Sequence, residues 1–168
     1  MSAAGVDKDI KEIVVRKEDA VFWMDGNGVW HNRHGRIAHP RIIEYFNSAI
    51  RKDSGGFYLY QAYDDIREKV YFACEGTALF AVDVVTDPGI TLVLNTKESV
   101  PLLPGALFTE KGRLCMRLDD GYVRLSEKAQ RILSEFIRED GERLVFMSEN
   151  GPFEIIETDC YFSLDKGE

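Results

Sequence analysis

All three histidines of the chain lie within the short stretch HNRHGRIAH, residues 31–39. Imidazole nitrogens are common ligands of zinc and similar ions, so metal binding is one chemistry that this stretch could carry out. The spacing matches no zinc signature, however, and no carboxylate lies close by in the sequence to complete a ligand set. We therefore predict no metal site and no cofactor. A metal-dependent hydrolase built on His31, His34 and His39 stays an alternative.

The same stretch is the one sizeable basic segment of an acidic chain. The chain has 29 acidic and 21 basic side chains, a net charge of −8, and no acidic residue between Asp25 and Glu44. Arginine binds phosphates and carboxylates through charge-assisted hydrogen bonds, and the first turn of a helix offers free N–H groups to an anion. The candidate anion-binding residues are Arg36, His39 and Arg41, with Arg33 and Arg51 as further candidates. The alternative is a solvated hairpin whose Arg and His side chains face water.

Aromatic residues provide a second kind of ligand contact. They alternate along neighbouring predicted strands, and those that face outward could stack on a planar ring. Trp30 and Tyr58 are the candidates for stacking against a base, although the sequence does not show which face of each strand is exposed.

No enzyme signature accompanies these residues. The chain has no GxGxxG, GxxxxGK[ST], HExxH or GxSxG motif. Its paired acidic residues, at 64–65 and 119–120, lie at turns, and neighbouring strand residues point to opposite faces, so neither pair suits acid–base catalysis. We therefore expect a non-enzymatic binding or sensor module. The alternative is an adaptor that binds proteins through a strand edge or an aromatic face.

The composition is typical of a folded, soluble protein, with 45% hydrophobic and 11% aromatic residues. The acidic charge disfavours DNA binding, and no apolar run approaches the roughly 20 residues that span a bilayer, so we expect neither DNA nor membrane as a partner. The polar N-terminus predicts no signal peptide, and three scattered cysteines agree with a reducing compartment. We expect a cytoplasmic protein in which Cys74, Cys115 and Cys160 are structural thiols.

The elements that must position the basic segment begin after a predicted N-terminal arm, residues 1–20. Gly-containing turns near residues 25–28 and 32–35 join short aromatic pieces, which is typical of hairpins. Pro40 opens a predicted helix that ends with Arg51 and Lys52 in its last turn, before a Ser-Gly-Gly stop. The apolar stripe of this helix comprises Ile42, Phe46, Ala49 and Ile50. Predicted strands follow over FYLYQAY, REKVYFAC, ALFAVDVV and ITLVLNT.

The second half repeats this order of elements. A hairpin over RLCMRL and YVRL leads to a helix that Ser126 caps, and a hairpin over RLVFMSE and PFEIIETD follows a Gly stop. The matching order predicts an α+β fold of two repeated units, each with antiparallel strands packed against one helix. We place these units at residues 21–96 and 97–168.

Residues 25–60, DGNGVWHNRHGRIAHPRIIEYFNSAIRKDSGGFYLY, resemble the bacterial family called domain of unknown function 1285. That family shows a DG.W strand, a turn with Gly, a helix and a Gly-aromatic strand. The stretches ALFAVDV, LVLNT and MSENGPFEI resemble its PF.AV strand, its F.TN strand end and its S.G.FF hairpin. The chain departs from the family at His39, where the family tends to have Arg, and at residues 61–65, where it has a TPVEK run.

The resemblance implies a duplicated α+β core whose C-terminal half is superficially like pleckstrin-homology folds. It implies no established catalytic activity, and it suggests a groove between the halves that holds a nucleotide-like ligand in signalling. This expectation agrees with the anion site that the basic segment at residues 33–41 predicts. We therefore expect a nucleotide-like or other anionic small molecule as the partner, with a protein partner as the alternative.

Overall fold

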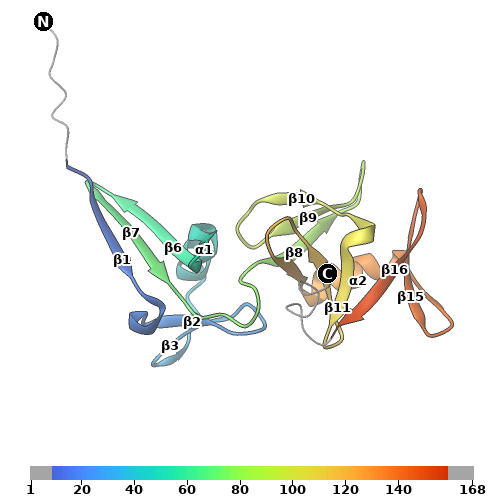
Figure 1. Cartoon of the computed structure of the whole chain (residues 1–168), viewed down its shortest axis with the longest axis horizontal. Helices are drawn as coiled ribbons and strands as arrows, with labels where there is room; N and C mark the ends of the chain where they lie inside the picture. Colours follow the sequence, from blue (N-terminus) through green and yellow to red (C-terminus); the bar gives the residue numbers. More distant parts are fainter. Residues whose placement is uncertain (1–8, 159–168) are drawn as a thin grey trace, which may run out of the picture. The chain divides into compact units, whose positions relative to one another are not determined.

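Strands form most of the secondary structure in the computed structural model of the chain, which describes residues 9–158 (Figure 1). These residues form two compact units. The first comprises residues 9–25 and 29–75, and the second comprises residues 26–28 and 76–158. The predicted α+β class is confirmed. The repetition of one unit in the other and the likeness to pleckstrin-homology folds stay predictions.

The first unit contains two sheets and one α-helix. Its elements are β1 (Lys11–Val15), the 3₁₀ helix η1 (Lys17–Asp19), β2 (Phe22–Met24), β3 (Trp30–Asn32), β4 (Gly35–Arg36), α1 (Pro40–Ala49), β5 (Ile50–Asp53), β6 (Gly56–Tyr63) and β7 (Ile66–Tyr71). One sheet has the order β1-β7-β6-β5 and the other β2-β3-β4. All neighbouring strands are antiparallel except β1 and β7, which are parallel.

Strand β1 corrects the prediction of an N-terminal arm over residues 1–20. Residues 11–15 pair with β7 in the register Lys11↔Ile66 to Val15↔Val70. The partner strand lies more than fifty positions along the chain, so no local pattern reports the pairing. Residues 1–8 of the predicted arm lie outside the described residues.

An aromatic cluster forms the core of the first unit. The ring of Trp30 on β3 is 1% exposed and lies 4.8 Å from the ring of Phe72 and 5.3 Å from that of Phe46 on α1. Phe22 on β2 packs beside all three rings. Trp30 Nε1 donates a hydrogen bond to Asn47 Oδ1 over 2.8 Å, so the polar atom of the buried indole has a partner. This cluster holds α1 against the three-stranded sheet.

Helix α1 begins at Pro40, as predicted, but it ends earlier than predicted. Ile50 already pairs with Leu59 across β5 and β6, so Arg51 and Lys52 lie on a strand rather than in the last helical turn. The apolar stripe is also narrower than predicted, since Ile42 is 43% exposed. The pairing of β5 with β6 satisfies backbone groups that further helical turns would otherwise have used.

The second unit contains one continuous sheet. Its elements are β8 (Phe80–Val85), β9 (Thr91–Leu94), β10 (Ser99–Pro101), η2 (Pro104–Ala106), β11 (Leu107–Glu110), β12 (Arg113–Arg117), β13 (Tyr122–Leu125), α2 (Glu127–Leu133), η3 (Ser134–Phe136), β14 (Ile137–Asp140), β15 (Arg143–Ser148) and β16 (Gly151–Thr158). The strand order is β10-β9-β8-β13-β12-β11-β16-β15-β14 (Figure 1, yellow-green to red). Two neighbouring pairs, β8 with β13 and β11 with β16, are parallel.

Helix α2 closes the apolar side of this sheet. Ser126 Oγ accepts a hydrogen bond from the Ala129 N–H over 3.2 Å, which confirms the predicted N-cap. Ala129 and Leu133 are fully buried against Val123 and Leu125 of β13. The predicted start of the helix is therefore correct, but the helix ends at Leu133 instead of near Glu139. Phe136 and Ile137, which were predicted to continue its apolar stripe, lie on η3 and β14.

The boundary between the two units differs from the one predicted from the sequence, which lay between residues 96 and 97. The compact units divide between Glu75 and Gly76. Strands β8 and β9, assigned to the first repeat from the sequence, belong to the sheet of the second unit because β8 pairs with β13 in the register Arg124↔Phe80.

Among residues 9–158, no helix is both long enough and apolar enough to cross a membrane.

A polar cluster lies on the side of β13 opposite to the apolar core. Arg124 is 6% exposed; its Nη1 donates to the Gly26 carbonyl over 2.8 Å and its Nη2 donates to the Tyr122 hydroxyl over 3.3 Å. Glu110 Oε1 lies 4.0 Å from the same Nη2.

Burial raises the pKa of Cys115 in this cluster to about 11, which keeps the thiol protonated and unreactive. Cys115 is thus buried, as predicted, and Cys160 lies outside the described residues.

Candidate functional site

Three side chains form a row across the outer face of the β2-β3-β4 sheet. Trp23 on β2 is paired with His31 on β3, and His31 is paired with Arg36 on β4. Residues directly opposite one another in antiparallel strands project from the same face of a sheet. The neighbouring pair, Met24 and Trp30, is 1% exposed at each residue and faces the core. The row of Trp23, His31 and Arg36 therefore faces solvent, and we call it the β2-β3-β4 row.

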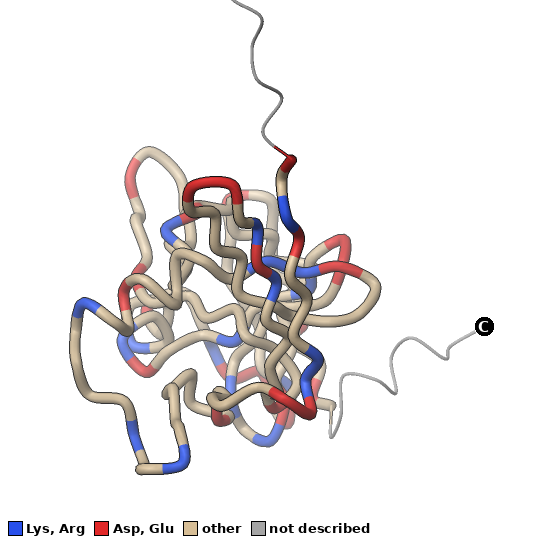
Figure 2. The backbone as a smooth tube through the Cα atoms, turned by 90° about the vertical axis from the view of Figure 1, so that its left-hand side faces the viewer, with Lys and Arg blue, Asp and Glu red and all other residues tan. Residues whose placement is uncertain are grey.

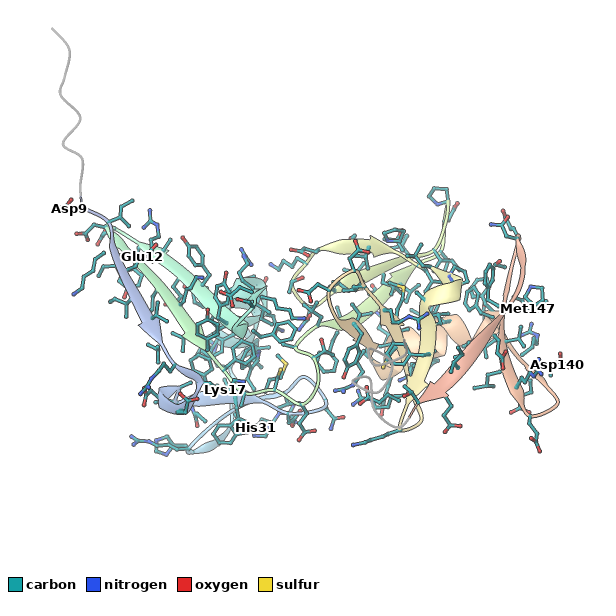
Figure 3. All side chains as sticks on the ribbon, viewed as in Figure 1. Asp9, Glu12, Lys17, His31, Asp140 and Met147 are labelled. Carbon is teal, nitrogen blue, oxygen red and sulfur yellow. The ribbon has the colours of Figure 1, made fainter. Side chains whose placement is uncertain are left out.

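The middle of this row is held in place by Asp25. His31 Nε2 lies 2.8 Å from Asp25 Oδ2, and Asp25 Oδ1 accepts a hydrogen bond from the Val29 N–H over 3.0 Å. The rings of Trp23 and His31 are nearly parallel, at an interplanar angle of 10° and a centroid distance of 5.8 Å. His31, which Figure 3 labels on β3, is therefore fixed on one side by a carboxylate and on the other by an indole. Trp23 itself keeps 42% of its surface exposed.

The basic end of the row carries exposed cations. Lys and Arg are interspersed with Asp and Glu along most of the backbone (Figure 2). Among the described residues, the side chains of Arg36, His39 and Arg41 make no hydrogen bond or ion pair. All three are exposed, whereas Arg33 donates from Nε to the His34 ring over 3.2 Å. Charges without a local partner are available to an external anion.

The start of α1 adds one backbone donor beside these cations. His39 is the N-cap residue, its side chain makes no capping hydrogen bond, and no acidic residue lies in the first turn. Pro40 has no N–H, and the N–H groups of Ile42 and Ile43 donate to the His39 carbonyl, so Arg41 supplies the N–H that lacks a partner within the helix. Arg36 and Arg41 are five residues apart, so their Cα atoms are at most about 18 Å apart. The hairpin and the helix start thus present their positive groups along one short segment.

The structure separates the remaining predicted site residues from this segment. Trp30 corrects the prediction of a stacking residue, because its ring is enclosed by the aromatic core and no ligand ring can reach it. Arg51 and Tyr58 are paired across β5 and β6. Arg51 Nη1 donates to the carbonyls of Ser48 and Ile50, so it caps the end of α1.

Tyr58 belongs to a polar network on the outer face of the four-stranded sheet. Lys69 Nζ lies 4.6 Å from the centre of the Tyr58 ring and 3.1 Å from Asp53 Oδ2. The Tyr71 hydroxyl donates to the same Asp53 oxygen over 2.7 Å. The bond from Tyr71, followed by that from Lys69, lowers the pKa of Asp53, and partial burial opposes this shift. The face of Tyr58 is thus occupied by a cation of the chain itself.

This network predicts a pH dependence of stability. Because the folded-state pKa of Asp53 lies below its unfolded value of about 3.9, its stabilising contribution is present above about pH 4 and is lost as the pH falls through the folded value. Asp53→Asn should therefore lower the melting temperature at about pH 6, and the gap to wild type should close below about pH 4. Thermal denaturation followed by circular dichroism across this range measures the gap.

Asp140→Asn is the matched control for Asp53→Asn. Asp140 is exposed on β14, and its side chain makes no hydrogen bond or ion pair with another described residue. The difference in melting temperature between Asp140→Asn and wild type should therefore be small and nearly the same at every pH. A constant gap between wild type and Asp53→Asn, from acid to neutral pH, would contradict the assignment of this network.

The histidines do not converge on a metal site. Within residues 9–158, no group of three or more His, Cys, Asp or Glu side chains is placed to hold a metal ion. His31 is bonded to Asp25, and the His34 N–H donates to Asn32 Oδ1 in the turn between β3 and β4. His39 stands at the start of α1. The three side chains that the hydrolase alternative requires are therefore not gathered into one group in the structure.

Trp23 is the site residue that the sequence analysis missed. The signal was present in VFWMD, where alternation places Phe22 and Met24 on one face and Trp23 on the other. Likewise, alternation in VWHN places His31 and Trp30 on opposite faces of β3. The choice between the two tryptophans follows once the core face is known, because only one of them can point outward with His31.

Comparisons with known proteins indicate the fold. No family model and no curated protein sequence matches the chain. The crystal structure of a DUF1285 family protein from Silicibacter pomeroyi DSS-3 aligns with a TM-score of 0.58 at 15% identity, over 93% of this chain and 86% of that chain. A DUF1285 family protein from Shewanella baltica OS155 aligns with a TM-score of 0.45 at 15% identity, over 69% of this chain and 92% of that chain. The resemblance predicted from the sequence is confirmed, and the chain is a distant structural relative of the DUF1285 family that shares its fold.

Proposed function

We propose that the chain is a non-enzymatic sensor module whose first unit binds a small ligand with a planar ring and an anionic group. The observation that carries this proposal is the β2-β3-β4 row, in which an exposed indole and an exposed guanidinium flank an immobilised imidazole. Trp23 supplies the surface for stacking, and Arg36 supplies the contact to the anion. Arg33 and Arg41 add positive charge around the same anion, and His39 adds a ring N–H as a hydrogen-bond donor.

The dimensions of the row support a ligand of nucleotide class. Trp23 and Arg36 are separated by two strand spacings, which is about 10 Å. Stacking of a base on an aromatic side chain contributes roughly 1–3 kcal/mol, and a hydrogen bond to a charged group contributes roughly 1.5–3 kcal/mol. Two such contacts favour a ligand that carries both groups over inorganic phosphate or a nucleoside alone. The location between the two halves, which the family resemblance implies, stays a prediction.

Binding can be tested with the intact chain and a panel of ligands. The panel comprises mono-, di- and cyclic nucleotides, with inorganic phosphate and an uncharged nucleoside as controls. A ligand at about 100 times its dissociation constant adds roughly 2.7 kcal/mol of stability, which raises the melting temperature by about 5–10 °C. We expect this shift with one nucleotide class and a much smaller shift with phosphate or nucleoside.

Tryptophan fluorescence locates the binding event. The chain has two tryptophans, of which Trp30 is buried and Trp23 is exposed. Stacking on Trp23 should quench the exposed component of the emission, and Trp23→Phe should remove this quenching while the Trp30 signal persists. The absence of a thermal shift with every nucleotide would refute the proposal and favour a protein-binding adaptor.

A further inference from the structure

The second unit contains a pocket of about 400 Å³ that belongs wholly to that unit. The turn between β8 and β9, the segment from Leu102 to Pro104, Phe136 of η3 and the turn between β15 and β16 enclose it. Small-molecule sites usually measure roughly 300–1,000 Å³ and are lined mainly by apolar and aromatic side chains. The volume of this pocket lies within that range.

The walls of the pocket suit a flat, apolar ring system. The rings of Phe136 and Phe146 lie 5.7 Å apart at an interplanar angle of 26°, so they present nearly parallel surfaces. Phe146 is 1% exposed and Leu102 is 8% exposed, which makes both parts of a fixed core rather than of a mobile surface. Phe153 also lines the pocket. Aromatic rings pack against such walls by offset stacking and edge contacts.

The rim of the pocket determines the charge that it accepts. Among residues 9–158, no Lys or Arg lines the pocket, and Glu149 is the one charged residue of its lining. Ser148 Oγ donates to the Gly151 carbonyl over 3.0 Å and accepts from the Asn150 N–H over 3.2 Å, so the turn that carries Glu149 is held by its own hydrogen bonds. An anion in this pocket would lose hydration, gain no cationic partner and face a carboxylate.

We propose that this pocket binds a small neutral or cationic molecule with a flat apolar ring system. The pocket therefore excludes the anions that the β2-β3-β4 row is proposed to bind, and different residues of a different unit form it. Met147, which Figure 3 labels on β15, lines the pocket and keeps 45% of its surface exposed. Gly89, on the turn between β8 and β9, also lines the pocket.

Gly89 provides a direct test of occupancy. Apart from its two chain neighbours, no described residue has a heavy atom within 4 Å of the position that a Cβ would take at Gly89. Its backbone is not left-handed, so a side chain is tolerated there. Gly89→Trp adds an indole at a lining position, and we expect this indole to occupy part of the pocket. Gly89→Ala changes the same backbone position without filling the pocket and serves as the matched control.

N-phenylnaphthylamine is a suitable neutral fluorescent probe, and anilinonaphthalene sulfonate differs from it by one sulfonate. We expect saturable one-site binding of the neutral probe to wild type and to Gly89→Ala, and a loss of roughly tenfold or more in affinity with Gly89→Trp. The sulfonate should bind about fivefold more weakly than the neutral probe, and Glu149→Lys should abolish or reverse this difference. Melting temperatures establish that each variant is folded.

Met147→Trp enlarges a second lining side chain and tests the proposal if Gly89→Trp does not fold. Neutral-probe affinity that is unchanged in both variants, or binding that does not saturate, would place the probe elsewhere and overturn the proposal. Equal affinity for the sulfonate and the neutral probe would overturn the assigned ligand charge. Variants of Trp23 or Arg36 should leave this binding unchanged, so the outcome is independent of the nucleotide proposal.

Discussion

The double replacement Arg36→Glu and Arg41→Glu should abolish nucleotide binding and leave the fold intact. Both side chains are exposed and make no hydrogen bond or ion pair with another described residue, so their loss should change stability by no more than about 0.5 kcal/mol. Two charge-assisted hydrogen bonds to an anion are together worth roughly 3–6 kcal/mol, and reversed charges add repulsion. Affinity should therefore fall by about 100-fold or more.

A second double variant controls for the change in net charge. Lys11 and Arg131 are exposed, lie far from the basic segment in the sequence, and have side chains without a hydrogen bond or ion pair among the described residues. Lys11→Glu with Arg131→Glu changes the net charge by the same amount. Isothermal titration of a nucleotide that shifts the melting temperature should show near-wild-type affinity in this control.

The comparison between the two double variants separates a site from a general electrostatic effect. Equal losses of affinity would mean that the overall charge of the chain, rather than Arg36 and Arg41, governs the association. Unchanged affinity in the Arg36 and Arg41 variant would place the nucleotide away from the β2-β3-β4 row. Trp23→Ala then tests the aromatic end of the same row, with an expected loss of roughly 1–3 kcal/mol in binding free energy.

The largest effect on stability is expected from Arg124→Met. The guanidinium of Arg124 donates to the Gly26 carbonyl, lies over the Phe80 ring at 5.7 Å and lies 4.0 Å from Glu110. The side chains of Arg124 and Glu110 are only 8% and 11% exposed. Removal of one partner from a buried ion pair costs roughly 3–5 kcal/mol because the other charge is left without compensation. The melting temperature of the 168-residue chain should fall by roughly 6–20 °C.

A double-mutant cycle identifies the source of this loss. Glu110 Oε2 is buried and has no hydrogen-bond partner among the described residues, so the charge of Glu110 depends on Arg124 for compensation. Arg124→Met combined with Glu110→Gln removes both charges and should recover at least about 1 kcal/mol relative to the sum of the single variants. Urea denaturation of the four proteins measures the coupling. Strictly additive losses would show that Arg124 acts through packing and the Gly26 contact alone.

Several elements were predictable from the sequence because their signals lie within a few residues. Pro40 begins α1 and Ser126 caps α2, as predicted, since each requires only the geometry of one helical turn. The Gly-containing turns at residues 119–121 and 150–151 join paired strands, as predicted, because a tight turn brings neighbouring segments together. Local chemistry therefore located most helices and hairpins of the chain.

Other features depend on partners that are distant in the sequence. The pairing of β1 with β7 and of β8 with β13 is parallel, and parallel neighbours cannot be joined by a tight turn. Because of these two pairings, residues 11–15 form a strand instead of part of the predicted arm, and residues 80–94 belong to the second unit instead of the predicted first repeat. The early end of α1 has the same origin, since Ile50 leaves the helix to pair with Leu59.

The candidate site shows the same division. The sequence alone shows that positive charge is concentrated between residues 33 and 41 of an acidic chain, and that aromatic side chains alternate along the neighbouring strands. Three features are visible only in the tertiary structure: Trp30 is buried, Trp23 is exposed beside His31, and Arg51 caps the end of α1. Charge and alternation are properties of adjacent residues. Which face of a strand is buried depends instead on the distant elements that cover it, here α1 and the residues that follow β7.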